Sequence, residues 1–557
     1  MASTIAALRE LERIKAEFGP AVAMRRRALI AQLAKAELRR VEHVVQLHEV
    51  LCFARAYPDD AATLAAVDRA LDGFGARRDV RRFAARLQDS GIAGTPTWFA
   101  FYWDTARWLV QRWPAQLAID WDEFDNRARV VPLLQQLLPY SETPGLDELD
   151  MEPGEWLATL KGPRESDAEF LVRRIDALSL AEPHKEALYD ALDVPMWLEA
   201  GGGTPSRTTG RWRGARPHFQ SGPLDRTRED LRAAAARAPL AVRRMTGAAA
   251  QELLDLAKTS MVTRSRDLDA FCNADLQDVR VVDCGEGLSF ALIGLRPERR
   301  LVLESSYGML TLKNGLPIGY VLISALFGSA AIAYNVFDTF RGGEAAKVLG
   351  RVIATARHVF GVDSVSIDPY QLGNGNDEGL RSGAWWFYQK LGFRPDEPEV
   401  VRLMNRELRR MQKDPGYRSD LDTMRELVQC HVHLHLGRAR DDVLGKIGLG
   451  AIGLRISALL AKRCGADREE GLDRCEAEAR AALGDGPGRG WTAGERLWWR
   501  RWSPLLCAIA DLARWTAAEK RAVVAVVRQK GGRHESDFVR AFDGHVRLRR
   551  AITRLAR

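Results

Sequence analysis

A glycine-containing turn that leads into a helix is the feature of this sequence with the clearest chemical meaning. Residues 341–346 read Arg-Gly-Gly-Glu-Ala-Ala, after an apolar run typical of a buried strand and before a stretch with helical periodicity. The first turn of a helix leaves backbone N–H groups without intrahelical partners, and the helix dipole favours an anion there. A strand that passes through this turn into a helix is therefore predicted to bind a diphosphate through backbone amides.

The elements that would position this turn follow from the apolar patterning. Strands are expected at 240–245, 279–282, 288–293, 301–304, 309–312, 318–325, 330–337 and 364–367. Helices are expected at 246–257, 344–360 and 377–391. Lys313-Asn314-Gly315 is typical of a hairpin turn, since Asn-Gly supplies the positive φ values that such turns need. This order predicts an α+β sheet with a helix crossing after its central strand.

Residues 236–400 resemble the GNAT superfamily of N-acetyltransferases. The resemblance depends on this order of elements and on three motifs: Gly319-Tyr320, Arg341-Gly342-Gly343, and the segment 387–393, which reads Phe-Tyr-Gln-Lys-Leu-Gly-Phe. It covers under a third of the 557 residues. It implies a GNAT-like mixed sheet in the centre of the chain, an acyl-CoA as substrate, most simply acetyl-CoA, and no metal.

The same resemblance assigns the diphosphate site. In this family the turn typically runs Arg-Gly-x-Gly-x-Gly or Ala, and its amides bind the CoA pyrophosphate. By position the cradle would consist of Arg341, Gly342, Gly343, Ala345 and Ala346. Glu344 departs from the pattern, because a carboxylate beside a diphosphate costs Coulomb energy unless it turns away or meets Arg341 or Lys347.

Tyr388 is the catalytic residue that the resemblance implies, as the general acid that protonates the departing CoA thiolate. A phenol with a pKa of about 10 suits a thiolate whose conjugate acid has a pKa of about 8.5. The family often places an asparagine seven positions earlier, whereas Asn374 and Asn376 lie 14 and 12 positions before Tyr388. The loop at 373–378 is therefore longer than usual. The alternative is that the aromatic run 385–388 serves only to pack a helix.

A general base cannot be singled out from the sequence. Transfer to an amine needs a neutral nucleophile, and a carboxylate or a water chain can remove the proton. Five acidic residues fall near predicted strand ends or loops: Glu304, Asp338, Asp368, Asp377 and Glu378. Glu378 is the one that we name as a candidate.

The rest of the chain divides by composition. Residues 1–200 have helical periodicity and hardly any strand signal, 201–235 form a linker rich in Gly, Pro and Arg, and 401–557 return to helix. All-helical regions are therefore expected on both sides of the GNAT-like part at 236–400. A length of 557 residues suits several domains, and 46% hydrophobic with 28% charged residues is typical of a folded protein.

Three other patterns have competing interpretations. His431, His433 and His435 could ligate a metal, but without further ligands at matching spacing a helix with partly buried histidines is favoured. Residues 448–453 match Gly-x-Gly-x-x-Gly but lack a preceding strand, which argues against a dinucleotide site. Five tryptophans could stack bases or pack helices, and packing is favoured: Trp98, Trp103, Trp108, Trp113 and Trp121.

Charge and targeting signals limit the partners. The excess of 8 positive charges is small for this length, and arginines of the linker such as Arg207 and Arg211 are compatible with RNA but equally with a solvated segment. Seven scattered cysteines and a polar N-terminus favour the cytoplasm. The uncharged stretch 314–337 is long enough for a membrane helix, but its β-rich composition favours two strands and no membrane partner.

Two functions of different classes remain open. The first is an acyl-CoA-dependent N-acyltransferase, with a small molecule, a protein or RNA as the amine acceptor and with helical flanks that build the acceptor site or hold a homo-oligomer. The second is a GNAT-like module that has lost catalysis and serves as a binding or regulatory part of a larger assembly. Arg341-Gly342-Gly343 and Tyr388 favour the enzyme, and Glu344 with the long loop favours the module.

Overall fold

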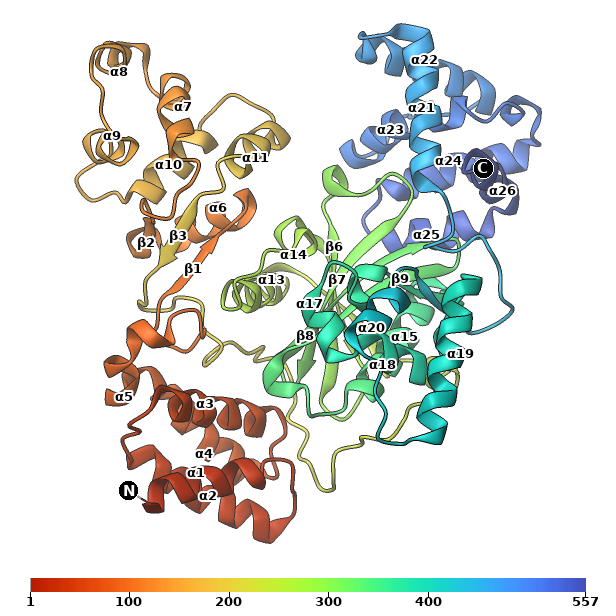
Figure 1. The fold of residues 1–557 in the computed structure, drawn as a ribbon. Helices are drawn as coiled ribbons and strands as arrows, with labels where there is room; N and C mark the ends of the chain where they lie inside the picture. The colour runs from red at the N-terminus through yellow and green to blue at the C-terminus, as the bar shows by residue number, and fades with distance from the viewer. Residues whose placement is uncertain (1) are drawn as a thin grey trace. The chain divides into compact units, whose positions relative to one another are not determined.

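The structure is a computed structural model that describes residues 2–557. The chain forms two compact units, each built from segments that are separate in the sequence. Unit 1 contains residues 1–223, 251–273 and 313–317, and unit 2 contains residues 224–250, 274–312 and 318–557. Figure 1 shows both units and labels many of their helices and strands.

Unit 1 consists mainly of short amphipathic helices around two apolar cores. Its helices are α1 Ala2–Arg13, α2 Pro20–Lys35, α3 Val41–Ala56, α4 Ala61–Asp72, α5 Arg78–Arg82, α6 Trp103–Arg112, α7 Val130–Leu137, α8 Thr143–Glu148, α9 Pro153–Leu160, α10 Asp167–Asp176, α11 Glu182–Asp190 and α14 Asp269–Cys272, with most of α13 Gly247–Val262. Trp103 and Trp108 of α6 are buried in the core that α6 shares with α7 and α10, which confirms the packing interpretation of these two tryptophans.

The expectation of an all-helical N-terminal region is wrong. A three-stranded antiparallel sheet, in the order β1-β3-β2, lies within it: β1 Thr97–Ala100, β2 Leu117–Ile119 and β3 Pro195–Leu198. Strands this short contain too few residues to show a period of two, and β3 follows β2 by about 75 residues of mostly helical sequence. Trp98 and Trp197 face each other across β1 and β3, and both indoles donate to Asp120, at 3.0 and 2.9 Å.

The Arg-rich run after residue 201 lies against the first helices of unit 1. Arg207 is paired with Glu49 at 2.8 Å, and Arg211 with Asp68 at 3.0 Å. Thr208 is fully buried and bonds His48 at 2.9 Å. These arginines therefore bind acidic side chains of the same unit, which weakens the case for this run as an RNA contact.

Unit 2 is built on a nine-stranded mixed sheet in the order β11-β12-β10-β9-β8-β7-β6-β5-β4. The strands are β4 Ala241–Met245, β5 Ala274–Asp283, β6 Leu288–Leu295, β7 Ser305–Lys313, β8 Leu316–Leu326, β9 Ser329–Val336, β10 Ser364–Ile367, β11 Arg394–Pro395 and β12 Val432–His435. The helices are α12 Leu231–Ala235, α15 Ala345–Phe360, α16 Pro369–Leu372, α17 Asp377–Ser382, α18 Ala384–Lys390, α19 Pro398–Lys413, α20 Leu421–Leu427, α21 Leu449–Cys464, α22 Arg468–Leu483, α23 Ala493–Cys507, α24 Ala517–Lys530, α25 Glu535–Gly544 and α26 Val546–Leu555.

Most of the predicted central elements are confirmed. The stretch 314–337 forms β8 and β9 with the hairpin turn before it, where Asn314 and Gly315 have φ values of 50° and 79°. Among residues 2–557, none of the helices has the length and apolar character needed to cross a bilayer. The predicted strand at 301–304 is wrong, since β7 begins at Ser305. The predicted helix at 377–391 is divided into α17 and α18 by Gly383, whose φ is 69°.

The expectation of pure helix after residue 401 is also wrong, because β12 completes the sheet. It lies between β10 and β11 and is antiparallel to both. His431-Val432-His433-Leu434-His435 alternates polar and apolar residues, which is the period of a strand rather than of a helix. This alternation is a local strand signal, although the sequence on both sides of it is helical.

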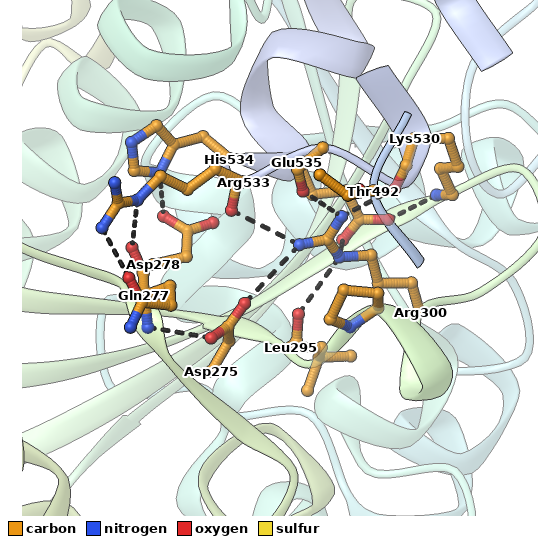
Figure 2. A network of polar contacts seen from close by, with 12 residues as sticks. Asp275, Gln277, Asp278, Leu295, Arg300, Thr492, Lys530, Arg533, His534 and Glu535 are labelled. Carbon is orange, nitrogen blue, oxygen red and sulfur yellow. Dashed lines mark hydrogen bonds and ion pairs between the residues drawn. The ribbon is translucent and has the colours of Figure 1, made fainter. Parts of the chain in front are cut away.

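The C-terminal helices share one apolar core with the sheet. Helix α15 packs on the sheet, and α25 lies beside α15 (Figure 1). A buried polar network joins the loop before β7 to the segment between α24 and α25 (Figure 2). Its centre is Arg300, whose guanidinium donates to the carbonyl oxygens of Lys530 and Gly532, both at 2.7 Å. Lys530 and Glu535 form a fully buried ion pair beside it.

One buried carboxyl group of α25 predicts a pH dependence of stability. Asp543 accepts the Gly328 N–H at 2.8 Å, and burial raises its pKa to about 7. In the folded state the Asp543 carboxyl group keeps its proton up to about pH 7, whereas an aspartate in the unfolded chain loses its proton at about pH 4. Folding binds the extra proton between these values, so this group's contribution to stability falls as the pH rises through that window.

We therefore expect Asp543→Asn to stabilise the protein relative to wild type more at pH 7 than at pH 5. The difference should be roughly 2 kcal/mol, because each pH unit between 5 and 7 contributes at most about 1.4 kcal/mol and the folded-state carboxyl is already about half deprotonated at pH 7. Unfolding followed by calorimetry at both pH values measures it. Asp537→Asn, an exposed position of the same helix, is the matched control and should show no such difference. An equal effect of Asp543→Asn at both pH values would contradict the prediction.

Candidate functional site

The turn at 341–346 joins the end of β9 to the first turn of α15, as the sequence predicts. A short 3-10 helix, Asp338–Phe340, follows β9, and Gly343 N–H then closes a turn on the Phe340 carbonyl at 2.9 Å. No side chain caps α15 within the described chain, so the amides of Ala345, Ala346 and Lys347 at the helix start lack a capping partner. A Cβ built on Gly342 would meet no atom within 4 Å. This turn thus offers backbone donors beside open space.

Glu344 is turned into the protein and paired. Its side chain is only 6% exposed and lies 3.3 Å from the Lys347 ammonium, one helical turn further on. Lys347 is also bound to Glu286 at 2.7 Å. Burial lowers the pKa of Lys347, but the two carboxylates outweigh it and raise this pKa overall. Glu344, which departs from the family pattern, is therefore neutralised by Lys347 of its own helix. This pairing is one of the two arrangements that would reduce the Coulomb cost of a carboxylate beside a diphosphate.

Two of the predicted site residues meet in an exposed ion pair. Arg341 binds Glu378, which lies 37 positions later at the start of α17, and also Asp338 at 2.9 Å. The side chains of Arg341 and Glu378 are 47% and 56% exposed. An ion pair this exposed contributes at most about 1 kcal/mol, so Arg341 can exchange its carboxylates for a phosphate at little cost.

Strand β9, which leads into the turn, separates from its parallel neighbour β10. Strand β10 is parallel to β9 but pairs only with its first residues, from Ser364 opposite Ser329 to Ser366 opposite Ala331. On its other side β9 remains paired with β8 as far as Val336. The edge of β9 from Ile332 to Val336 that faces away from β8 therefore has no strand partner among residues 2–557. Backbone N–H and C=O groups along this edge can bond an extended ligand that carries amides.

Tyr388 lies in α18 with its ring inside the apolar core. The side chain is 3% exposed and packs edge to face against Phe393, with ring centroids 5.4 Å apart. Burial raises the pKa of the Tyr388 phenol well above its ordinary value. The hydroxyl therefore stays protonated at neutral pH, which an acid requires. The same burial also agrees with the packing alternative.

Asn376 and the acidic residues Asp368 and Asp377 make local contacts. Asn376 caps α17 by accepting the Gly379 N–H at 3.1 Å, and its amide donates to the Tyr370 carbonyl. Asp368 caps α16 and is paired with His431 at 3.3 Å. Asp377 is 82% exposed and lies 3.7 Å from Arg381. Glu304 lies before β7, and burial raises its pKa. None of these described carboxylates combines burial with a position at the turn.

The other patterns from the sequence resolve as follows. The three histidines lie on one face of the segment that contains β12, and their rings are stacked with centroids 6.2 and 6.1 Å apart. Within residues 2–557 no group of three or more His, Cys, Asp or Glu side chains is arranged to hold a metal ion. Gly448 caps α21 after a loop that begins at residue 436, so the glycine pattern does not follow a strand directly.

Comparison with known proteins finds no matching family model, no matching curated protein and no matching solved structure. The features of unit 2 that bear on function are therefore the turn at 341–346, the separated strands and the residues around them.

Proposed function

We propose that unit 2 binds an acyl-CoA and transfers its acyl group to an amine, as a GNAT-like N-acyltransferase. The single observation that carries this proposal is the separation of β9 from β10 directly before the turn at 341–346. CoA has a diphosphate at one end and an arm with two amides that leads to the thiol. The uncapped start of α15 suits the diphosphate, and the open edge of β9 suits the amide arm.

The roles of the residues follow from this placement. Amides of Gly342, Ala345 and Ala346 would bind the diphosphate, and Arg341 would leave Glu378 for a phosphate oxygen. The phenol of Tyr388 would give its proton to the thiolate sulfur as the thioester C–S bond breaks and the amine nitrogen bonds to the acyl carbon. The amine loses one proton to a base, for which Glu378 remains the candidate once Arg341 is engaged elsewhere.

A second candidate is a module that binds acyl-CoA without turnover. Two observations favour it: Tyr388 is almost fully buried, and Asn376 is occupied as a helix cap rather than directed at a ligand. Both candidates share the same binding site, and they differ in whether the bound acyl group is transferred.

Acetyl-CoA is expected to raise the melting temperature of the wild-type protein by mass action, and ADP-ribose is expected to raise it less. Gly342→Asp should abolish the shift, because it places a carboxylate where the diphosphate would lie. The fold should tolerate it, since a Cβ at this position meets no atom within 4 Å. Thermal unfolding at millimolar ligand measures both.

Gly450→Asp is the matched control. It makes the same substitution at another open glycine of unit 2, near the start of α21, where a Cβ also meets no atom within 4 Å. This variant should keep the full shift. An unshifted wild-type transition at millimolar acetyl-CoA would remove both candidates that depend on CoA.

A further inference from the structure

Arginines from two distant parts of unit 2 line one recess of about 830 Å³. One wall is the loop 438–442 after β12, and the other is α26 with the residues that follow it. The lining contains six arginines and three aspartates: Arg438, Arg440, Arg549, Arg550, Arg554, Arg557, Asp363, Asp441 and Asp442. A recess of this size lies within the range of small-ligand sites, about 300–1,000 Å³.

Two of the arginines are neutralised and hold the walls in place. Arg440 binds Asp363 at 2.8 Å and Asp442 at 2.6 Å, and it also donates to the Phe327 carbonyl. Arg549 of α26 donates to the same Asp442 at 2.8 Å. Asp442 therefore connects the loop to the helix, and Arg440 connects the loop to the sheet. A ligand would find this frame already formed, which reduces the entropy lost on binding.

The other four arginines are exposed, and none of them has an ion pair or a side-chain hydrogen bond to another described residue: Arg438, Arg550, Arg554 and Arg557. Asp441, the remaining aspartate, is 94% exposed and paired with Lys446 at 3.3 Å. The recess thus carries an uncompensated positive charge from several guanidinium groups. Their planar donors match phosphate oxygens and suit two contacts per phosphate.

A second recess of about 920 Å³ adjoins the first along α26 and shares Arg550 and Arg554 with it. These two arginines are four residues apart on the helix, about 6 Å along its axis, so they can contact neighbouring groups of one ligand. Arg547, which lines only the second recess, is paired with Glu519 at 3.0 Å and Asp511 at 3.2 Å. The free guanidinium groups therefore gather on the side of the first recess.

We propose that this arginine recess binds a compact ligand that bears two or more phosphate groups. None of the described residues that line it is aromatic, so it lacks the stacking surface that single-stranded nucleic acids use. Asp363 precedes β10, and Arg440 reaches Phe327 before β9, so the recess lies at the opposite end of β9 from the turn at 341–346. The eight residues of β9 span roughly 26 Å. The recess is therefore a separate anion site.

The test uses the full chain and inorganic tripolyphosphate as the probe, with orthophosphate and a short single-stranded RNA as comparison ligands. Calorimetric titration at about 0.15 M salt should show tripolyphosphate binding at least tenfold more tightly than orthophosphate. Arg550→Gln/Arg554→Gln should weaken tripolyphosphate binding at least tenfold and keep the fold, because both positions are exposed and glutamine is a good helix former.

Arg409→Gln/Lys413→Gln is the matched control, since it removes two exposed, unpaired positive charges at the same spacing from α19. This variant should bind as wild type does. Equal tripolyphosphate binding by wild type and both double variants would overturn the proposal. Any such binding would then be assigned to another site, such as the turn at 341–346, which these substitutions leave intact. No tripolyphosphate binding at millimolar concentration would overturn the proposal as well. RNA binding that depends on Arg550 and Arg554 without competition from tripolyphosphate would replace it with a nucleic-acid surface.

Discussion

Lys530→Met is expected to lower the free energy of unfolding of unit 2 by about 3–5 kcal/mol, because it removes the nearest cation of the buried Glu535 carboxylate and leaves only the Arg300 guanidinium, 4.0 Å away. Both side chains are fully buried, and the Lys530 ammonium also donates to the Glu304 carbonyl at 2.6 Å. Burial lowers the pKa of Lys530 to about 8 and raises the pKa of Glu535. The pair joins α24 and α25 to the start of β7, so the loss should separate the C-terminal helices from the sheet.

The double variant Lys530→Met/Glu535→Gln is the control that isolates the charge. It removes both charges of the pair. Arg300 loses the Glu535 carboxylate at 4.0 Å but keeps its backbone carbonyl partners and Asp275, which lies 3.9 Å from it (Figure 2). We expect the double variant to recover most of the lost stability. Denaturant unfolding followed by tryptophan fluorescence measures both, since Lys530 lies 5.2 Å from the Trp498 ring centroid. A double variant as unstable as the single one would show that packing of the lysine chain, not charge, is decisive.

Tyr388→Phe is expected to lower turnover of acetyl-CoA by about 10²–10⁴-fold while acetyl-CoA binds nearly as before. The substitution keeps the ring against Phe393 and removes only the hydroxyl that would protonate the thiolate. Slow hydrolysis of acetyl-CoA, followed by release of free thiol, is a measurement that needs no acceptor. Tyr417→Phe, which also loses a phenol hydroxyl but lies in the loop between α19 and α20, is the control and should keep wild-type turnover.

The packing alternative predicts a different pattern for the same position. Tyr388→Phe would then leave turnover unchanged, and only Tyr388→Ala would reduce stability, by about 3–5 kcal/mol, because it opens a cavity in the core. Equal hydrolysis by wild type and Tyr388→Phe, with acetyl-CoA bound by both, would count against Tyr388 as the acid. Water or another residue would then protonate the departing thiolate.

The sequence by itself determined the elements whose signals are local. The hairpin at Asn314 and Gly315 and the strand, turn and helix through 330–360 were predicted close to their observed bounds. Positive φ values, helix starts and apolar periods depend on neighbouring residues, so they can be read from a single chain. The uncapped start of α15, the central feature of the candidate site, belongs to this class.

Only the tertiary structure decided which distant segments meet. The pairing of β12 between β10 and β11, the short sheet β1-β3-β2, and the separation of β9 from β10 depend on strand partners far apart in the sequence. The same is true of charges: Arg341 meets Glu378 across 37 positions, and Arg549 meets the Asp442 carboxylate, which Arg440 also binds, across more than 100. A charged residue has the same sequence signature whether it is solvated, paired or part of a recess, because its partners are set by the fold and not by its neighbours in the chain.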